Sequence, residues 1–381
     1  MTENLARARK SILANATAGS LCLGFLSLFC LALFLRNPNV AISYMNRGMQ
    51  ICVRTVIPSL FPFMVISEAI LSSGIGALLI RPISPLLQKL FRLSETGACA
   101  LLLGMLCGFP IGAKCTAIAL DRGQIDREEA ARLLAFSNSP SSAFLISAVG
   151  ISLWKSRQIG VALLLTVLIT QLLTGLLLAG LPNKRKKTEP PLPLFEQGKA
   201  RPLGTSLSCF TDAVKSSALG MLTVCAYVIF FSTLSGALGL ILDGLGASTV
   251  LKASTFCFLE LSGGMSAASA IPNAKTALLL SAFCAGWSGL SVHCQILSVC
   301  DGRGLRWRSY FLAKLLQGGV CAGIFAVFLA CFPSLLQTVG STAQATFSAS
   351  HPIPFLTFLF LLSLLPIAWS RLKRKSPPAN G

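Results

Sequence analysis

Long apolar runs without a charged residue are the feature that most restricts how this chain folds. Such runs cover residues 11–35, 133–154, 158–182, 216–242 and 315–350. About 20 consecutive apolar residues span the hydrocarbon core of a bilayer as a helix, and a core helix of a soluble protein has no reason to be this long. Across the 381 residues, 54% are apolar and only 12% are charged. The sequence therefore predicts an all-α polytopic membrane protein and excludes a soluble enzyme, a fibrous protein and a disordered chain.

The positive charge of the chain lies in short clusters between the apolar runs. The 32 Lys and Arg residues outnumber the 13 Asp and Glu residues, which gives a formal net charge of +19. Membrane proteins gather Lys and Arg in cytoplasmic loops, and these clusters lack the aromatic residues interleaved in nucleic-acid-binding surfaces. We therefore attribute the charge to topology and expect no nucleic-acid partner. Most of the 14 cysteines lie inside apolar runs without a CxxC pair, so we expect buried thiols, no metal site and no cofactor.

Eight membrane-spanning helices and two broken apolar segments are predicted. The broken segments, residues 96–120 and 253–273, contain glycines and a proline, and we expect them to re-enter the membrane without crossing it. With both re-entrant, most Lys and Arg residues lie on the cytoplasmic side together with both termini, as the positive-inside rule requires. The cluster of residues 303–314 is assigned to that side. The predicted spans are residues 17–35, 55–80, 133–154, 159–181, 219–242, 276–299, 310–332 and 354–370.

The order of these segments recurs in two halves. In each half an amphipathic stretch, residues 40–54 or 205–219, precedes a span, a broken segment and two further spans. Because each half crosses the membrane three times, an odd number, the second half is inverted relative to the first. Many secondary transporters have such inverted repeats and bind substrate between them. Broken helices also occur in structural membrane proteins, and that alternative stays open. The predicted organisation is an anchor helix at 1–39, a first repeat at 40–182, a basic cytoplasmic linker at 183–203, a second, inverted repeat at 204–332, an outer loop at 333–353, and a C-terminal helix with a basic tail at 354–381.

Two polar segments of the first half are candidate substrate sites. In residues 108–114, glycines and a proline free backbone N–H groups that favour an anion, and Lys114 adds a charge inside the apolar run. The alternative is that Lys114 extends to the cytoplasmic face. In residues 137–142, small polar side chains surround a proline, and their alternative role is to cap a helix. The candidate substrate-binding residues are Gly108, Pro110, Gly112, Lys114, Asn138, Ser139, Ser141 and Ser142.

The second half offers two matching segments, residues 260–264 and 286–295. Glu260 places a carboxylate inside the membrane, and His293 adds an ionisable ring. Together with Glu68 in an earlier span, these residues are candidates for proton or ion coupling; the alternative is a structural pairing with Lys114. The candidate substrate-binding residues of this half are Ser262, Gly263, Gly264, His293 and Gln295.

An intramembrane protease is the enzyme hypothesis that the sequence raises. Residues 286–289 fit the G-x-S-G pattern of rhomboid-type proteases, with Ser288 as the nucleophile. A nucleophile and its base need hydrogen-bond reach. His293 follows five residues later and projects from another face of the same helix, and His351 lies in a Pro-rich outer loop. We therefore expect no enzyme activity and assign no catalytic residue.

The motifs resemble the sporulation integral membrane protein family called YlbJ or SpoVV. The resemblance runs from about residue 43 to residue 332, so it includes both halves. Ser139, Ser141 and Ser142 depart from the family pattern, in which Gly or other small residues are expected around the proline. The motifs that carry the resemblance are residues 61–63, 108–114, 138–140, 260–264 and 289–295.

The resemblance implies a nucleoside-recognition Gate domain and a protein of endospore-forming bacteria, placed in the outer forespore membrane of the mother cell. It also implies transport of dipicolinic acid from the mother cell toward the forespore. The alternatives are a nucleoside or other small-solute symporter and a non-transporting scaffold of a sporulation membrane complex. The expected partners are an anionic small molecule and membrane lipid, and other sporulation membrane proteins or further copies of the chain are open alternatives.

Overall fold

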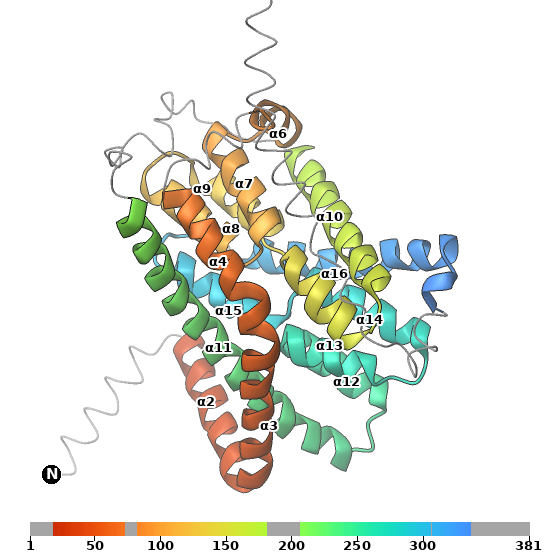
Figure 1. The fold of residues 1–381 in the computed structure, drawn as a ribbon. Coiled ribbons are helices and arrows are strands. Elements are labelled where there is room, and N and C mark those ends of the chain that lie inside the picture. Colours follow the sequence, from red (N-terminus) through yellow and green to blue (C-terminus); the bar gives the residue numbers. More distant parts are fainter. Residues whose placement is uncertain (1–17, 73–81, 181–205, 306, 337–381) are drawn as a thin grey trace, which may run out of the picture.

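The computed structural model describes four stretches of the chain: residues 18–72, 82–180, 206–305 and 307–336. Every regular element in these stretches is helical (Figure 1). Five helical segments there are long and apolar enough to cross a membrane, and a sixth is added if the bent pair over residues 84–107 forms one span. The all-α membrane fold is thereby confirmed, whereas the predicted total of eight spans is not. The predicted span at 354–370 lies outside the described residues.

Two long helices, one from each half, pack against each other. The first consists of α3 (Pro38–Ile51), the π-helical turn η1 (Cys52–Val56) and α4 (Ile57–Ser72), and α2 (Ala18–Arg36) precedes it. The second is α11 (Ser206–Gly244), which packs along both α3 and α4 (Figure 1). The predicted amphipathic stretches are therefore wrong as separate elements, because each continues without a break into the following span.

The π-helical turn η1 has a local cause. The Ile57 N–H donates to Cys52 O, one residue further back than in an α-helix. Pro58 follows directly and has no N–H to donate, and its ring would crowd the carbonyl four residues earlier. Widening the helix by one residue ahead of Pro58 relieves this conflict and lets the helix continue.

Two helical hairpins have their tips inside the molecule. α7 (Glu95–Cys107) and α8 (Ile111–Asp121) meet at residues 108–110, and α12 (Thr249–Leu259) and α13 (Leu261–Ser269) meet at Glu260. The arms of each hairpin approach closely at a glycine. A Cβ added to Gly104 would lie 3.0 Å from Gly112 Cα, and one added to Gly264 would lie 2.4 Å from Cys257 Cα. The breaks predicted in these two apolar segments are therefore present.

Two further segments predicted as spans contain a break. The span predicted at 133–154 is corrected, whereas residues 274–300 remain among the five segments that are long and apolar enough to cross a membrane. α9 (Arg127–Phe136) ends before residues 137–141, after which a new helix runs to Leu153, most of it the π-helical η2 (Phe144–Leu153). α14 (Ala274–Trp287) and α15 (Gly289–Cys300) are separated at Ser288. Hydropathy did not reveal either break, because it averages side-chain polarity and carries no information on backbone direction.

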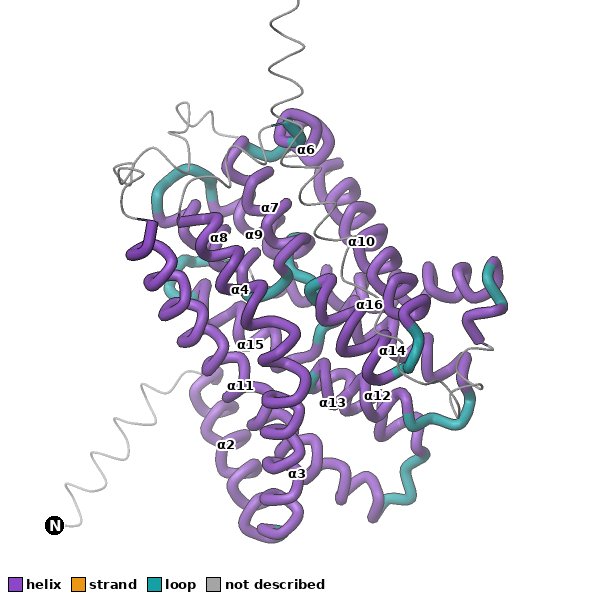
Figure 2. The backbone as a smooth tube through the Cα atoms, in the orientation of Figure 1, coloured by secondary structure: helices purple, strands orange, loops and turns teal. Residues whose placement is uncertain are grey.

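The remaining helices enclose these breaks. α6 (Ser84–Phe91) leads into α7, and α10 (Arg157–Gly180) and α16 (Trp307–Cys331) pack on each other and on α14. Figure 2 shows loop segments inside the bundle of helices as well as at its ends. The fold thus brings irregular backbone from both halves into the protein interior.

Candidate functional site

Four helix breaks, two from each half, meet at the centre of the molecule. In chain order they lie at residues 108–110, 137–141, 260 and 288. The Phe109 N–H donates to Ser139 O at 3.0 Å, which joins the first break to the second. A Cβ on Gly289 would lie 3.0 Å from Glu260 Cα, so the third and fourth breaks also touch. Gly108 and Gly289 have φ angles of 74° and 83°, in the left-handed region that glycine adopts without a steric penalty.

Each break is followed by a helix that starts there, so four helix N-termini lie at the centre. They belong to α8, to the helix over residues 142–153, to α13 and to α15. Helix N-termini carry unpaired N–H groups and a partial positive charge, which attract anions. One of them is already occupied, because the Glu260 carboxylate accepts hydrogen bonds from the N–H groups of Ser262 at 2.8 Å and Gly263 at 2.5 Å.

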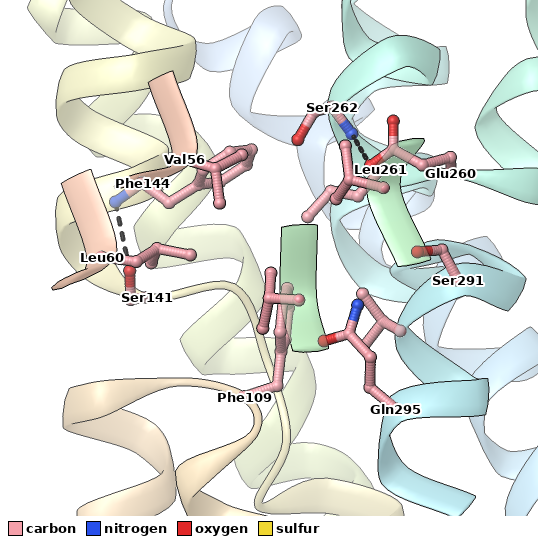
Figure 3. A pocket seen from close by; sticks show the side chains of 13 residues that line it. Val56, Leu60, Phe109, Ser141, Phe144, Glu260, Leu261, Ser262, Ser291 and Gln295 are labelled. Atoms are coloured by element: carbon pink, nitrogen blue, oxygen red, sulfur yellow. Dashed lines mark hydrogen bonds between the residues drawn. The ribbon is translucent and has the colours of Figure 1, made fainter. Parts of the chain in front are cut away.

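A cavity of about 20 Å³ lies between the breaks (Figure 3). This volume has room for about one water molecule. Its polar lining consists of Ser141, Glu260, Ser262, Ser291 and Gln295, contributed by both halves. The apolar lining consists of Val56, Leu60, Phe109, Phe144, Val224, Val228, Leu261 and Val292.

Three predicted substrate-binding residues line this cavity. Ser141, Ser262 and Gln295 do so, and the Ser141 hydroxyl also caps a helix by accepting the Phe144 N–H at 3.2 Å. Ser291 also lines the cavity and was not among the predicted residues, although it lies one helical turn before Gln295 and therefore on the same helix face. Whether these residues bind substrate stays a prediction.

Lys114 lies outside the cavity lining and forms an ion pair. Its Nζ is 2.7 Å from Glu68 Oε1 and 2.8 Å from Ser216 Oγ, and the Ser216 hydroxyl donates to the same carboxylate oxygen at 3.2 Å. The side chains of Lys114 and Glu68 are 36% and 21% exposed. Of the alternatives considered for these two residues, the structure contains the ion pair, which links α8, α4 and α11.

His293 is buried and is likewise absent from the cavity lining. Its Nδ1 lies 2.8 Å from the Tyr310 hydroxyl, and its ring packs on Trp287 with centroids 4.3 Å apart. The Ser288 hydroxyl donates to Ala285 O at 3.3 Å. The two residues considered as a protease dyad therefore hydrogen-bond to other partners, and His351 lies outside the described residues.

The second break, residues 137–141, is held by donors from several elements. Asn138 Nδ2 donates to Leu134 O at 3.1 Å, Gln171 Nε2 of α10 donates to Phe136 O at 2.9 Å, and Lys314 Nζ of α16 donates to Asn138 O. Backbone groups freed inside a membrane must find partners in the protein. Asn138 thus shapes the break in this structure, although its Oδ1 has no partner among the described residues.

The position of Lys314 differs from the one predicted. The sequence predicts it in the cytoplasmic cluster of residues 303–314, whereas in the structure it is buried, at 1% exposure, within α16. Its Nζ also donates to Gln317 Oε1 at 2.9 Å. One signal was available in the sequence: Lys314 stands among apolar residues, and Gln317 follows on the same helix face.

The sequence is similar to known membrane proteins. Residues 53–155 match the Gate family, described as nucleoside recognition. The chain is 30% identical over 332 residues to the sporulation integral membrane protein YlbJ of Bacillus subtilis (strain 168), in a match that covers 79% of this chain and 80% of that protein. No solved structure matches the chain significantly.

Proposed function

Because the chain belongs to the family of the sporulation integral membrane protein YlbJ, we propose that it transports dipicolinic acid from the mother cell across the outer forespore membrane. The observation that carries this proposal is the meeting of four helix breaks, two from each half, around one small cavity whose lining is mostly apolar with a few polar side chains. Many transporters bind substrate between broken helices near the membrane midplane. A scaffold needs no such arrangement.

The chemistry of the central region suits a planar aromatic dianion. Dipicolinate has two carboxylates on a rigid ring, and helix N-termini favour carboxylates. Three of the four central N-termini lack the acidic side-chain cap that Glu260 gives α13. Phe109 and Phe144 offer ring contacts, and Ser291 and Gln295 offer hydrogen bonds. The buried Lys314 adds a positive charge behind the second break.

Transport requires the cavity to open, since about 20 Å³ holds one water and not an aromatic ring. In our proposal both hairpins re-enter the membrane, the second half is an inverted copy of the first, and both termini are cytoplasmic. Substrate then gains access alternately from the two sides as one half moves against the other. The protein moves its substrate without changing it chemically.

The test is uptake of labelled dipicolinate by liposomes that contain the purified protein. We expect saturable uptake, and we expect Ser291→Ala and Gln295→Ala each to raise the half-saturating concentration by about tenfold, the effect of losing one hydrogen bond of about 1.4 kcal/mol. Ser298→Ala is the matched control, because this exposed α15 hydroxyl bonds back to Gln295 O. Uptake no faster than in protein-free liposomes would contradict the proposal.

A nucleoside symporter is the second candidate, favoured by the match of residues 53–155 to the nucleoside-recognition family. A competition experiment, in which excess nucleoside is added during dipicolinate uptake, distinguishes the two candidate substrates. Excess nucleoside should leave dipicolinate uptake unchanged if our proposal holds, whereas inhibition together with uptake of the nucleoside itself would favour the second candidate. If folded protein took up neither compound, a non-transporting role in a sporulation membrane complex would be favoured.

A further inference from the structure

Lys314 places a buried amine among neutral oxygens. It is 1% exposed, and among the described residues no carboxylate lies within ion-pair distance of its Nζ. Its two acceptors are Asn138 O and Gln317 Oε1. Burying an ammonium without a counter-ion costs several kcal/mol, so the surrounding oxygens must offset most of that cost.

These oxygens have the chemical type and the location, at a helix C-terminus, of the ligands of a small cation. Asn138 O belongs to unwound backbone directly after the C-terminus of α9, and helix C-termini carry a partial negative charge. Asn138 Oδ1 is buried and has no partner among the described residues. The amide of Gln317 turns its oxygen toward the ammonium, and its Nε2 is left without a described partner.

Unwound carbonyls and half-helix C-termini are the groups with which secondary transporters bind a coupling cation. We propose that Lys314 is a tethered cation: its ammonium holds, at the break of residues 137–141, the position that a free coupling ion takes in other transporters. The ammonium reaches this position from α16 of the second half and so fastens that half to a break of the first. As a consequence, transport by this chain does not depend on Na⁺, a point that rests on the proposed function.

Chemical rescue of the full-length protein tests the tethered cation without measuring transport. The midpoint of thermal unfolding in detergent is followed with a thiol-reactive fluorophore, since most of the described cysteines are buried. Lys314→Ala removes the ammonium and leaves the oxygens in place. Lys252→Ala is the control, because Lys252 lies at the surface and pairs with Asp243 at 2.5 Å. Ethylammonium, Na⁺ and tetramethylammonium, which has no N–H donor, are compared at equal ionic strength.

We expect Lys314→Ala to lower the midpoint and ethylammonium or Na⁺ to restore at least half of the loss, while tetramethylammonium restores none. Lys252→Ala should not respond to any of the three cations. Rescue of Lys314→Ala by no cation, or equally by all three, would overturn the proposal. If Lys314→Ala does not fold, the thermal unfolding of the wild-type protein is compared in Na⁺ and in tetramethylammonium. A higher midpoint in Na⁺ overturns the proposal, and equal midpoints support it.

Uptake measurements then test the consequence for coupling. Wild-type uptake of dipicolinate should be the same with Na⁺ or with N-methylglucamine, and uptake by Lys314→Ala should require Na⁺ or ethylammonium. Wild-type uptake that needs Na⁺ would contradict the tethered cation. Absence of uptake by the wild type would contradict only the transport function, and the unfolding measurements would still decide on Lys314.

Discussion

Charged side chains inside the apolar body of the protein are stabilised in two different ways. Lys114 has a carboxylate partner in Glu68, and a shared contact with Ser216 orients the pair. Lys314 has only neutral oxygens. An ion pair cancels both charges locally, whereas neutral oxygens leave a net positive charge in the interior. The two lysines therefore have different electrostatic effects on their surroundings, although both lie in apolar sequence.

The first prediction at this scale concerns the ion pair of Glu68 and Lys114. Removing one partner leaves the other charge in an apolar environment, so Glu68→Gln and Lys114→Met should each destabilise the protein by about 1–3 kcal/mol. This is less than for a fully buried pair, because both side chains are partly exposed. The double variant should be more stable than the sum of the two losses predicts. Unfolding in detergent measures all three variants, and simple additivity would contradict the pairing.

The same variants test whether Lys114 binds substrate. If Lys114 acts only in the ion pair, the double variant should take up dipicolinate with the half-saturating concentration of the wild type. A tenfold or greater increase in the double variant would indicate that Lys114 has the substrate-binding role proposed from the sequence.

The second prediction concerns Asp121 and Arg303, at the surface and outside the membrane-spanning helices. The Arg303 guanidinium donates to both carboxylate oxygens of Asp121, at 2.7 and 2.8 Å, and these hydrogen bonds lower the pKa of Asp121. Because the folded pKa is below the unfolded value of about 3.9, the pair stabilises the protein above that pH and ceases to do so as the pH falls through the folded pKa.

A double-mutant cycle with Asp121→Asn and Arg303→Gln measures this effect. We expect a coupling free energy of at most about 1 kcal/mol at neutral pH, since the Asp121 side chain is 51% exposed. The coupling should shrink in high salt and vanish at acidic pH below the folded pKa. A coupling that persists in acid would show that the carboxylate charge is not its source.

At the scale of elements, the hairpins depend on glycines where their arms approach. Gly264 lies on α13 against the backbone of α12, and a Cβ there would meet Cys257 Cα and N at 2.4 and 2.7 Å. Backbone atoms cannot move aside as a flexible side chain does. The close approach brings the Glu260 tip to the cavity, so the glycine positions the candidate site without lining it.

Gly264→Ala should therefore force the two arms apart and destabilise the protein by about 1–3 kcal/mol. Gly319→Ala is the matched control, since Gly319 is also helical and an added Cβ meets nothing within 4 Å. The control should be neutral or more stable by up to about 1 kcal/mol, because alanine favours the helix. Equal midpoints of thermal unfolding for the two variants would contradict the packing of this hairpin.

At the scale of the whole molecule, the candidate site belongs to neither half alone. Phe109 and Ser141 come from the first half, and Glu260, Ser291 and Gln295 come from the second (Figure 3). α11 runs along α3 and α4, and α16 along α10, so helices of the two halves also pack in pairs around the breaks. Movement of one half against the other would therefore open or close the cavity, as alternating access requires.

The proposed topology is tested with reporter fusions in a Gram-negative host. With both termini cytoplasmic and the loop at 333–353 outside, green fluorescent protein at the C-terminus should fluoresce, and alkaline phosphatase inserted at 333–353 should be active. Phosphatase inserted in the linker at 183–203 is the control and should be inactive, because the basic residues there favour the cytoplasm. The opposite pattern would overturn the proposed orientation.

Local sequence was enough to predict the membrane class, the all-α fold and two of the four breaks. Whether a segment is long and apolar depends only on its own residues, and the Gly and Pro residues at 108–112 act on the backbone locally. The position of the break at 108–110 was therefore predictable, whereas the segment at 253–273 breaks at Glu260 and not at its glycines or its proline. Glu260 and Gln295 stood out in the sequence as polar residues in apolar surroundings, and their roles stay predictions. Shared family motifs added the sporulation context.

Which breaks meet and which charges pair depends on contacts between distant parts of the chain. Residues 137–141 have the same hydropathy whether they cap a helix or interrupt one, and the break depends on Gln171 and Lys314 from distant helices. Likewise, a lysine in apolar sequence is equally compatible with an ion pair, with hydrogen bonds to neutral oxygens, or with extension to the surface. The choice depends on which oxygens the fold brings within hydrogen-bond distance, and no local pattern carries that information.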